Sequence, residues 1–508
     1  MHPPLRPWAA RAAVGALAVS MLPLAATTAS AAPAAPAATP ALSAARPVAG
    51  GPSAGDSLFP EIGNTGYDVR HYAIALTYAK DGSIKATTTI QAKAKKRLTS
   101  FSLDLEGLTV DRVRVDGREA TFTRAKTKLV VTPARAAAGR FTVAVRYQGK
   151  PVTHIDPDGS QDGWVPSPTS GGATALSEPV GSQTWFPNNN TPRDKAAYDI
   201  ALTVPKKLAA ASNGVLKSRR TSHGRTTWRW QQRQPMATYL SLVAIGRFDV
   251  YRSTVTLQHG RRIPAWTFVQ PELGDAAAQR ALLPKVLRFS EKQYGPYPFD
   301  ATGMVIQKLG VGYALETQTR PFFDGVPDDS TVVHELAHQW YGDAVTPKDW
   351  GDIWLNEGFA SYAEDNWTAE HGGPSTWASF QETYDANGPD SDLWKPAPIR
   401  LTDGEQLFGD SSYVRGRLTL EALRREIGDR DMRTLLRTWA ERYRGRSVTT
   451  SQFVALAERV SGEDLGAFFR VWLEVPAKPA GYEGKRAQAE VGAAVAVTPP
   501  SGSRRRQA

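Results

Sequence analysis

The chain has 508 residues, 41% hydrophobic and 22% charged, which is enough for two or three domains with large cores. It has no cysteine, which excludes a disulfide framework, a thiolate zinc site and a thiol nucleophile. The net charge of +11 would suit a nucleic-acid-binding protein, but much of the excess lies near the two ends, in Arg6, Arg11, Arg46 and the run 504–506. We therefore expect no nucleic-acid partner.

Residues 1–31 have the pattern of a secretory signal peptide. Arg6 and Arg11 are followed by an apolar run over residues 12–26, and residues 29–31 fit a cleavage site of small side chains. The apolar run is shorter than the roughly 20 residues of a membrane helix, and no cysteine follows that could carry a lipid. We predict Sec-type export to the extracellular space without a stable membrane anchor; an alanine-rich leader is the alternative.

Residues 32–55, rich in Ala, Pro and Gly, are predicted to form a flexible linker. Residues 56–250 are predicted to form a β-rich N-terminal domain without long helices. Apolar and polar side chains alternate, as in half-buried strands, over residues 71–78, 101–105 and 141–147.

Residues 251–475 are predicted to form a second, mainly helical domain, which makes the expected fold class α+β. The sequence pattern predicts a helix over residues 275–294, a strand over residues 304–307 and a metal-binding helix from about Thr331. Two amphipathic helical stretches follow, over residues 418–444 and 451–472. Residues 476–508 are again rich in Ala, Pro and Gly and are predicted to form a disordered basic tail.

The most informative motif is the sequence His334-Glu335-Leu336-Ala337-His338. Two histidines four residues apart share one face of a helix and can bind one Zn²⁺ ion, while Glu335 lies beside them as a general base. Glu357 follows His338 after eighteen intervening residues and is the candidate third ligand, which leaves the fourth position for water. The alternative is two surface histidines and an ion-paired glutamate. The full spacing favours one catalytic Zn²⁺ ion per chain.

Two further residues are candidates for supporting roles. Tyr413, expected just before a helix that returns toward the site, could donate a hydrogen bond to the developing oxyanion. Glu364 lies two helical turns after Glu357 and could hold the second nitrogen of a histidine ligand. A structural tyrosine and a solvated carboxylate are the respective alternatives.

Together these motifs resemble the M1 zinc aminopeptidases, the gluzincin family of aminopeptidase N and leukotriene A4 hydrolase. The resemblance covers roughly residues 56–475. It rests on the segments 334–343, 356–360 and 413–416, and upstream on the segments 66–72, 185–187 and 295–300. It implies a β-sheet saddle domain followed by a thermolysin-like catalytic domain.

The resemblance also implies roles for individual residues. His334, His338 and Glu357 would be the zinc ligands, Glu335 the base and Tyr413 the oxyanion donor. Two more residues, Glu316 and Glu178, would bind the free N-terminus of a peptide substrate.

The chain departs from the family pattern around Glu316. The family segment Gly-Ala-Met-Glu-Asn occurs here as Tyr313-Ala314-Leu315-Glu316-Thr317, so the carboxylate is kept while its neighbours differ. We expect this chain to lack the long C-terminal helical domain of many members, because little sequence follows Trp472.

The function predicted from the sequence is thus that of a secreted zinc aminopeptidase acting on peptides with a free N-terminus. A thermolysin-like endopeptidase would share the metal and the base but would need no amine anchor. A non-catalytic binding module on the same fold is the third possibility.

Overall fold

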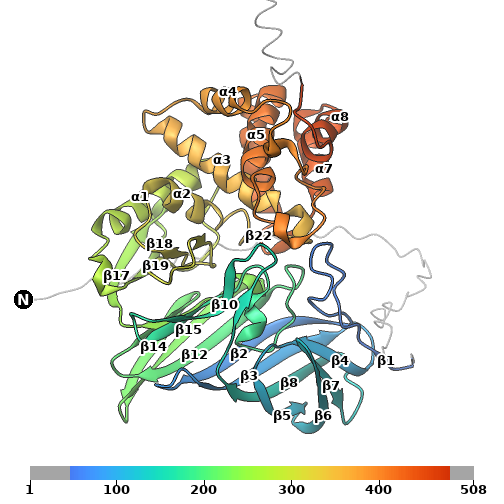
Figure 1. The fold of residues 1–508 in the computed structure, drawn as a ribbon, viewed down its shortest axis with the longest axis vertical. Coiled ribbons are helices and arrows are strands. Elements are labelled where there is room, and N and C mark those ends of the chain that lie inside the picture. The colour runs from blue at the N-terminus through green and yellow to red at the C-terminus, as the bar shows by residue number, and fades with distance from the viewer. Residues whose placement is uncertain (1–45, 481–508) are drawn as a thin grey trace, which may run out of the picture. The chain divides into compact units, whose positions relative to one another are not determined.

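The computed structural model describes residues 46–480, a strand-rich part followed by a mainly helical one (Figure 1). These residues form two hydrophobic cores, one mainly between strands and one mainly between helices. The predicted α+β organisation, a β-sheet domain followed by a mainly helical one, is confirmed. The predicted signal peptide lies outside the described residues. Over the range 46–480, no helix is long and apolar enough to cross a membrane.

The first domain is built on an eleven-stranded sheet that is antiparallel except at the β1–β4 and β2–β12 pairs. Buried residues alternate with more exposed ones along its long strands, as the sequence pattern predicts. In sheet order the strands are β1 (Val48–Ala49), β4 (Leu98–Asp104), β7 (Lys128–Pro133), β6 (Arg118–Ala125), β5 (Thr109–Val115), β8 (Arg140–Gly149), β3 (Ile84–Ala94), β2 (Tyr67–Tyr78), β12 (Ala196–Pro205), β15 (Arg225–Met236) and β14 (Val215–Ser222).

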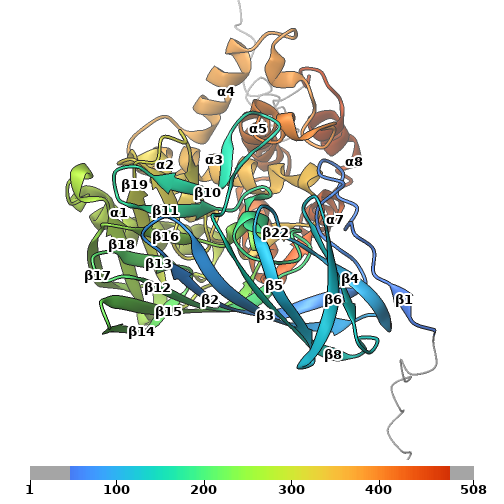
Figure 2. The ribbon, with the colours of Figure 1, turned by 60° about the horizontal axis from the view of Figure 1, so that its bottom comes forward.

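A second sheet of five strands lies against the first, as Figure 2 shows and as the 3.0 Å hydrogen bond from Trp230 Nε1 to the Ala210 carbonyl indicates. Its order is β13 (Ala209–Ser212), β16 (Val243–Gly246), β11 (Gly172–Leu176), β10 (Gln161–Ser167) and β9 (Thr153–Ile155). This sheet matters for function because β11 ends just before Glu178, and because the β9–β10 hairpin reaches the functional pocket described below.

The second domain begins with another five-stranded sheet, close to the predicted boundary at residue 250. Its order is β17 (Asp249–Thr256), β18 (Arg262–Val269), β19 (Thr302–Gln307), β21 (Phe322–Asp324) and β20 (Ala314–Leu315). Every residue of β19 is buried, and this sheet shares a core with α1 (Ala277–Tyr294) and α2 (Asp329–Ala337). The short strand β20 leads directly to Glu316.

The remaining helices complete the second domain: α3 (Trp354–Glu370), α4 (Thr376–Ala386), α5 (Asp410–Ile427), α6 (Asp429–Arg442), α7 (Thr450–Ser461) and α8 (Gly466–Phe469), which continues into a π-helical turn over Arg470–Glu474. A two-stranded parallel sheet joins β22 (Val345–Pro347) to β23 (Arg446–Val448). The predicted helical stretch 418–444 is two helices, because Gly428 at φ 82° ends α5. Tyr413 lies inside the first turn of α5, not before the helix.

The described parts of the predicted linker and tail, residues 46–55 and 476–480, are more ordered than their composition indicated. Within the predicted linker, β1 pairs with β4, and Arg193 donates to the carbonyl of Ala54 at 2.6 Å. At the start of the predicted tail, Lys478 Nζ lies 4.0 Å from the Tyr384 ring centroid and donates to the Tyr384 carbonyl at 2.8 Å. These long-range contacts hold residues 46–55 and 476–480 in spite of their composition.

Candidate zinc site and active-site pocket

Helix α2 carries His334, and His338 is the C-cap residue directly after the helix, still in a helical conformation. Asp328 caps its N-terminus by accepting a 2.8 Å hydrogen bond from the Thr331 amide, and the rings of His334 and His338 lie 4.7 Å apart at their centroids. Glu357, in the first turn of α3, places Oε2 3.4 Å from Nε2 of each histidine. Nitrogen and oxygen donors from the three residues all lie within 4.8 Å of one another.

The outer nitrogens of both imidazoles are already engaged. His334 Nδ1 lies 2.7 Å from Glu364 Oε1, and His338 Nδ1 lies 3.0 Å from the Tyr341 carbonyl. When the Nδ1 atoms carry the protons, both Nε2 atoms are unprotonated. Their lone pairs then point toward the Glu357 carboxylate, so that all three groups can bind one metal ion. The three buried or half-buried donors therefore fit Zn²⁺ with a fourth position left for water.

Glu335 lies beside this group and lines the same pocket. Its side chain is buried, and its Oε2 has no hydrogen-bond partner among the described residues. Burial raises the pKa of this carboxyl to about 8, while the two histidines oppose the shift. A carboxyl group in this position can accept a proton and later return it.

Tyr413 reaches the site from α5, and its ring stacks on that of His334 with centroids 5.8 Å apart and planes 18° apart. Burial raises the pKa of the phenol well above its usual value, and the carboxylate of Glu357 adds to the shift. The hydroxyl therefore keeps its proton and remains a hydrogen-bond donor.

A close helix crossing fixes the spacing between Glu357 and Tyr413. Gly358 of α3 meets Gly416 of α5 so closely that a Cβ on Gly358 would lie 2.8 Å from the Gly416 Cα. The two backbones are in direct contact, so any larger residue at Gly358 or Gly416 would force helices α3 and α5 apart.

The structure also brings together the two predicted substrate-binding glutamates. Glu178 comes from the β domain and Glu316 from the edge of the second domain's sheet, yet carboxylate oxygens of both lie within 4.8 Å of each other and of Glu357. Each is buried, and in each Oε1 has no hydrogen-bond partner within residues 46–480. Burial raises the pKa of Glu178 well above its usual value, and Glu316 adds to the shift. A cation between the two carboxylates would relieve this repulsion.

Seven of the eight predicted site residues line one cavity of about 220 Å³. The eighth, Glu364, is not among the lining residues and contacts His334 Nδ1. Its wall also contains residues that the sequence did not single out as functional: Asp158, Ser160, Tyr313, Ala314, Leu315 and Phe408. Tyr313 replaces the glycine of the family segment and donates from its hydroxyl to the Gln161 carbonyl at 2.5 Å. The substituted side chain thus ties the segment before β20 to the β9–β10 hairpin.

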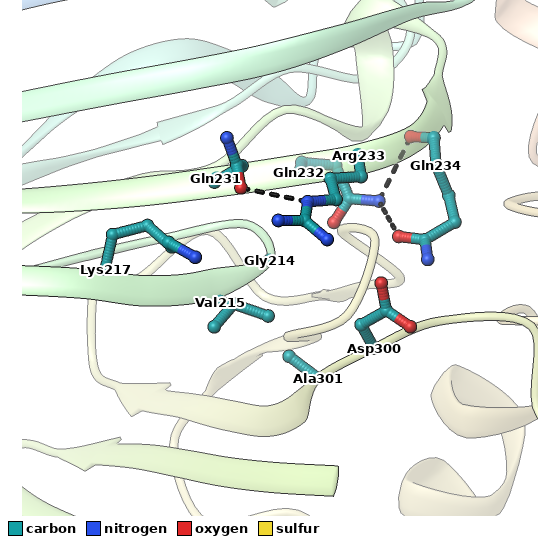
Figure 3. Close-up of a pocket in the computed structure, with 9 residues that line it drawn as sticks. All are labelled: Gly214, Val215, Lys217, Gln231, Gln232, Arg233, Gln234, Asp300 and Ala301. Carbon is teal, nitrogen blue, oxygen red and sulfur yellow. Dashed lines mark hydrogen bonds between the residues drawn. The ribbon is translucent and has the colours of Figure 1, made fainter.

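A larger hollow of about 310 Å³ lies elsewhere, between β14, β15 and the segment Asp300–Ala301 (Figure 3). Its nine lining residues are mostly polar and include no histidine, and its glutamine and arginine side chains bond to one another, as from Arg233 Nε to Gln231 Oε1 at 3.0 Å. It does not combine the acids, bases and metal donors found in the smaller cavity.

The fold and the donor set of two histidines and one glutamate together are those of a zinc metallopeptidase. The chain belongs to peptidase family M1: the Peptidase M1 N-terminal domain model matches residues 69–240, and the Peptidase family M1 domain model matches residues 327–472. Zinc is accordingly the cofactor of this site. The predicted family is confirmed.

Solved structures and related sequences agree with this assignment. The M1 zinc metallopeptidase from Deinococcus radiodurans is 29% identical, with a TM-score of 0.75, and the match covers 84% of this chain and 99% of that one. A mutant of the Deinococcus radiodurans enzyme bound to a Tyr-Ser-Ala substrate gives a TM-score of 0.76 at 28% identity, again over 84% and 99% of the two chains.

Among curated sequences, probable aminopeptidase 2 of Sulfurisphaera tokodaii is 26% identical over 75% of this chain and 50% of its own length. Bovine glutamyl aminopeptidase is 29% identical over 58% of this chain and 33% of its own length. The chain thus spans half or less of the length of these two relatives.

Proposed function

We propose that this protein is a zinc-dependent aminopeptidase that hydrolyses the N-terminal peptide bond of peptides. The observation that carries the proposal is the convergence of Glu178 and Glu316 beside the zinc ligand Glu357. The relatives named as aminopeptidases and the tripeptide bound to the Deinococcus radiodurans mutant support the same activity.

The paired carboxylates are suited to an α-amino group. Such a group has a pKa of about 7.7–8.0 and is largely cationic at neutral pH. Placed between Glu178 and Glu316, it would replace their mutual repulsion by charge-assisted hydrogen bonds that contribute roughly 1.5–3 kcal/mol each. The first peptide bond would then lie over the His334–His338–Glu357 group.

Held by His334, His338 and Glu357, Zn²⁺ would act as a Lewis acid and would lower the pKa of a bound water to about 7. Glu335 takes the proton of the attacking water and returns it to the leaving amine. Tyr413 donates its hydroxyl proton in a hydrogen bond to the carbonyl oxygen as that oxygen gains negative charge. Glu364 and the Tyr341 carbonyl hold the histidines in the tautomer that binds metal.

Acetylation of the substrate's N-terminus is expected to nearly abolish cleavage, because it removes the charge that the two glutamates bind. Glu316→Ala should lower kcat/KM for free peptides by about 10–1,000-fold, because it removes one or two charge-assisted hydrogen bonds to the amino group. Peptide pairs that differ only in the acetyl group would be compared by mass spectrometry. The matched control is Glu382→Ala, which removes an exposed carboxylate from α4.

An endopeptidase with the same metal and base predicts a different result. It would release internal fragments from blocked and free peptides at similar rates, and Glu316→Ala would affect both equally. A chain that binds zinc but cleaves neither substrate would instead be a binding module.

Tyr413→Phe is expected to lower kcat by about 10²–10³-fold with little change in KM, since it removes one oxyanion donor and leaves the stacked ring. Steady-state kinetics on a free peptide measure both constants. A higher KM at unchanged kcat would make Tyr413 a substrate-binding residue instead.

We further propose that the protein is secreted and that its mature form begins near Ala32. The proposal is supported by the charged start, the apolar run and the small residues at 29–31. N-terminal sequencing of protein recovered from the culture medium is expected to begin near Ala32. Protein retained in cells with Met1 intact would contradict it.

A further inference from the structure

A second group of metal-binding side chains lies at the base of the β9–β10 hairpin. Donor atoms of His154, Asp156 and Asp162 all lie within 4.8 Å of one another, and His154 Nε2 lies 3.9 Å from Asp156 Oδ1. None of the three belongs to the zinc site, which is built from α2 and α3.

The two carboxylates are buried without adequate compensation. Asp156 and Asp162 are 5% and 1% exposed. Both oxygens of Asp156 and Oδ1 of Asp162 lack a hydrogen-bond partner in the described part of the chain. Within residues 46–480 the one ion-pair contact of either side chain is the 3.9 Å contact of Asp156 with His154, and neither pairs with a lysine or arginine. Burial raises the pKa of Asp156 to about 7. Buried carboxylates of this kind need a proton or a cation.

The histidine is arranged as a ligand. Its Nδ1 lies 3.1 Å from Glu106 Oε2, which also accepts a 3.1 Å hydrogen bond from Gln183 Nε2. A carboxylate on one imidazole nitrogen orients the ring and leaves Nε2 free to bind a metal. In this structure that free nitrogen faces Asp156.

We propose that His154, Asp156 and Asp162 form a second metal site, which takes a divalent transition-metal ion such as Zn²⁺ or Mn²⁺. Two carboxylates offer the oxygen ligands that Mn²⁺ accepts, and the imidazole favours transition metals over Ca²⁺ or Mg²⁺. Three convergent protein ligands leave room for water to complete the coordination.

The site would stabilise one wall of the active-site pocket. Asp162 Oδ2 already accepts hydrogen bonds from the amides of Val180 and Gly181, at 3.2 and 2.6 Å, just after Glu178. The hairpin between the ligands contributes Asp158 and Ser160 to the pocket lining. A bound ion would therefore fix the hairpin against the segment that carries an amine-binding glutamate. This is a structural role, separate from the proposed catalysis.

Metal content tests the proposal without any activity measurement. The purified chain, dialysed against buffered Zn²⁺ or Mn²⁺, is expected to hold two equivalents by mass spectrometry of the metals. Asp156→Asn and Asp162→Asn should each hold one, whereas Asp158→Asn, on the same hairpin, should still hold two. His334→Ala should lose the catalytic ion and keep the other. Circular dichroism would establish that each variant is folded.

One equivalent in the wild-type chain would overturn the proposal, and so would two equivalents in both the Asp156 and Asp162 variants. If neither variant folds, the His334→Ala chain decides, because it must still bind one equivalent. Binding of Ca²⁺ in place of Zn²⁺ and Mn²⁺, unchanged in His154→Ala, would overturn the assignment of the histidine as a ligand. None of these outcomes depends on whether the protein cleaves peptides.

Discussion

Replacing Glu335 by glutamine is expected to leave the zinc site loaded and to lower kcat by about 10²–10⁴-fold, the usual contribution of a general acid–base group. Glutamine keeps the shape of the side chain, and the donors of His334, His338 and Glu357 are untouched. The amide, however, cannot take the proton of water. Metal content and kcat, measured on the same preparation, separate these two effects.

Near-normal kcat in the Glu335→Gln variant would show that another group accepts the proton. Loss of zinc in that variant would show instead that the side chain supports the ligands. The Glu382→Ala variant, with both metal content and kcat close to those of the wild type, is the control for handling and folding.

Glu357→Ala is expected to lower the metal content by one equivalent relative to the wild type and to remove the activity with it. The change deletes one of only three protein ligands and leaves the two Nε2 atoms without their common carboxylate partner. Direct measurement of metal content and of peptide hydrolysis after dialysis gives the result.

Glu364→Gln is the matched comparison, because Glu364 contacts His334 but not the other donors. It should weaken metal binding by only about 10–100-fold, so that added zinc restores activity. If Glu357→Ala keeps its full metal content, Glu357 is not a ligand, and the third donor would have to be sought among the other pocket carboxylates.

The sequence predicted those parts of the fold that depend on local pattern. The alternation of apolar and polar side chains identified the long strands. Helical periodicity predicted the start of α1 within two residues of Ala277, where the helix begins. The break at Gly428 was missed because amphipathic periodicity continues on both sides of it. The order of residues 46–55 was also missed, because it depends on pairing with β4 far along the chain.

The site residues also fall into those that local sequence pattern predicts and those that only the assembled fold brings together. His334, Glu335 and His338 are close in sequence, so helical geometry alone puts them together, and Glu357 follows at a characteristic spacing. Glu178 could be reached only through the family resemblance, since it comes from the other domain. His154 and Asp156 are two residues apart at the end of β9, but their relation to Glu106 and Asp162 emerges only when the sheets are assembled.

The backbone contact between Gly358 and Gly416 means that some parts of the pocket tolerate substitution less well than others. The relative position of α3 and α5 depends on two residues that have no side chain to vary. Another part of the wall, which includes Tyr313 and Phe408, is made of side chains on loops and a strand edge. New substrate preferences can thus accumulate on that wall while the reaction centre stays unchanged, which makes it the place to begin when engineering specificity.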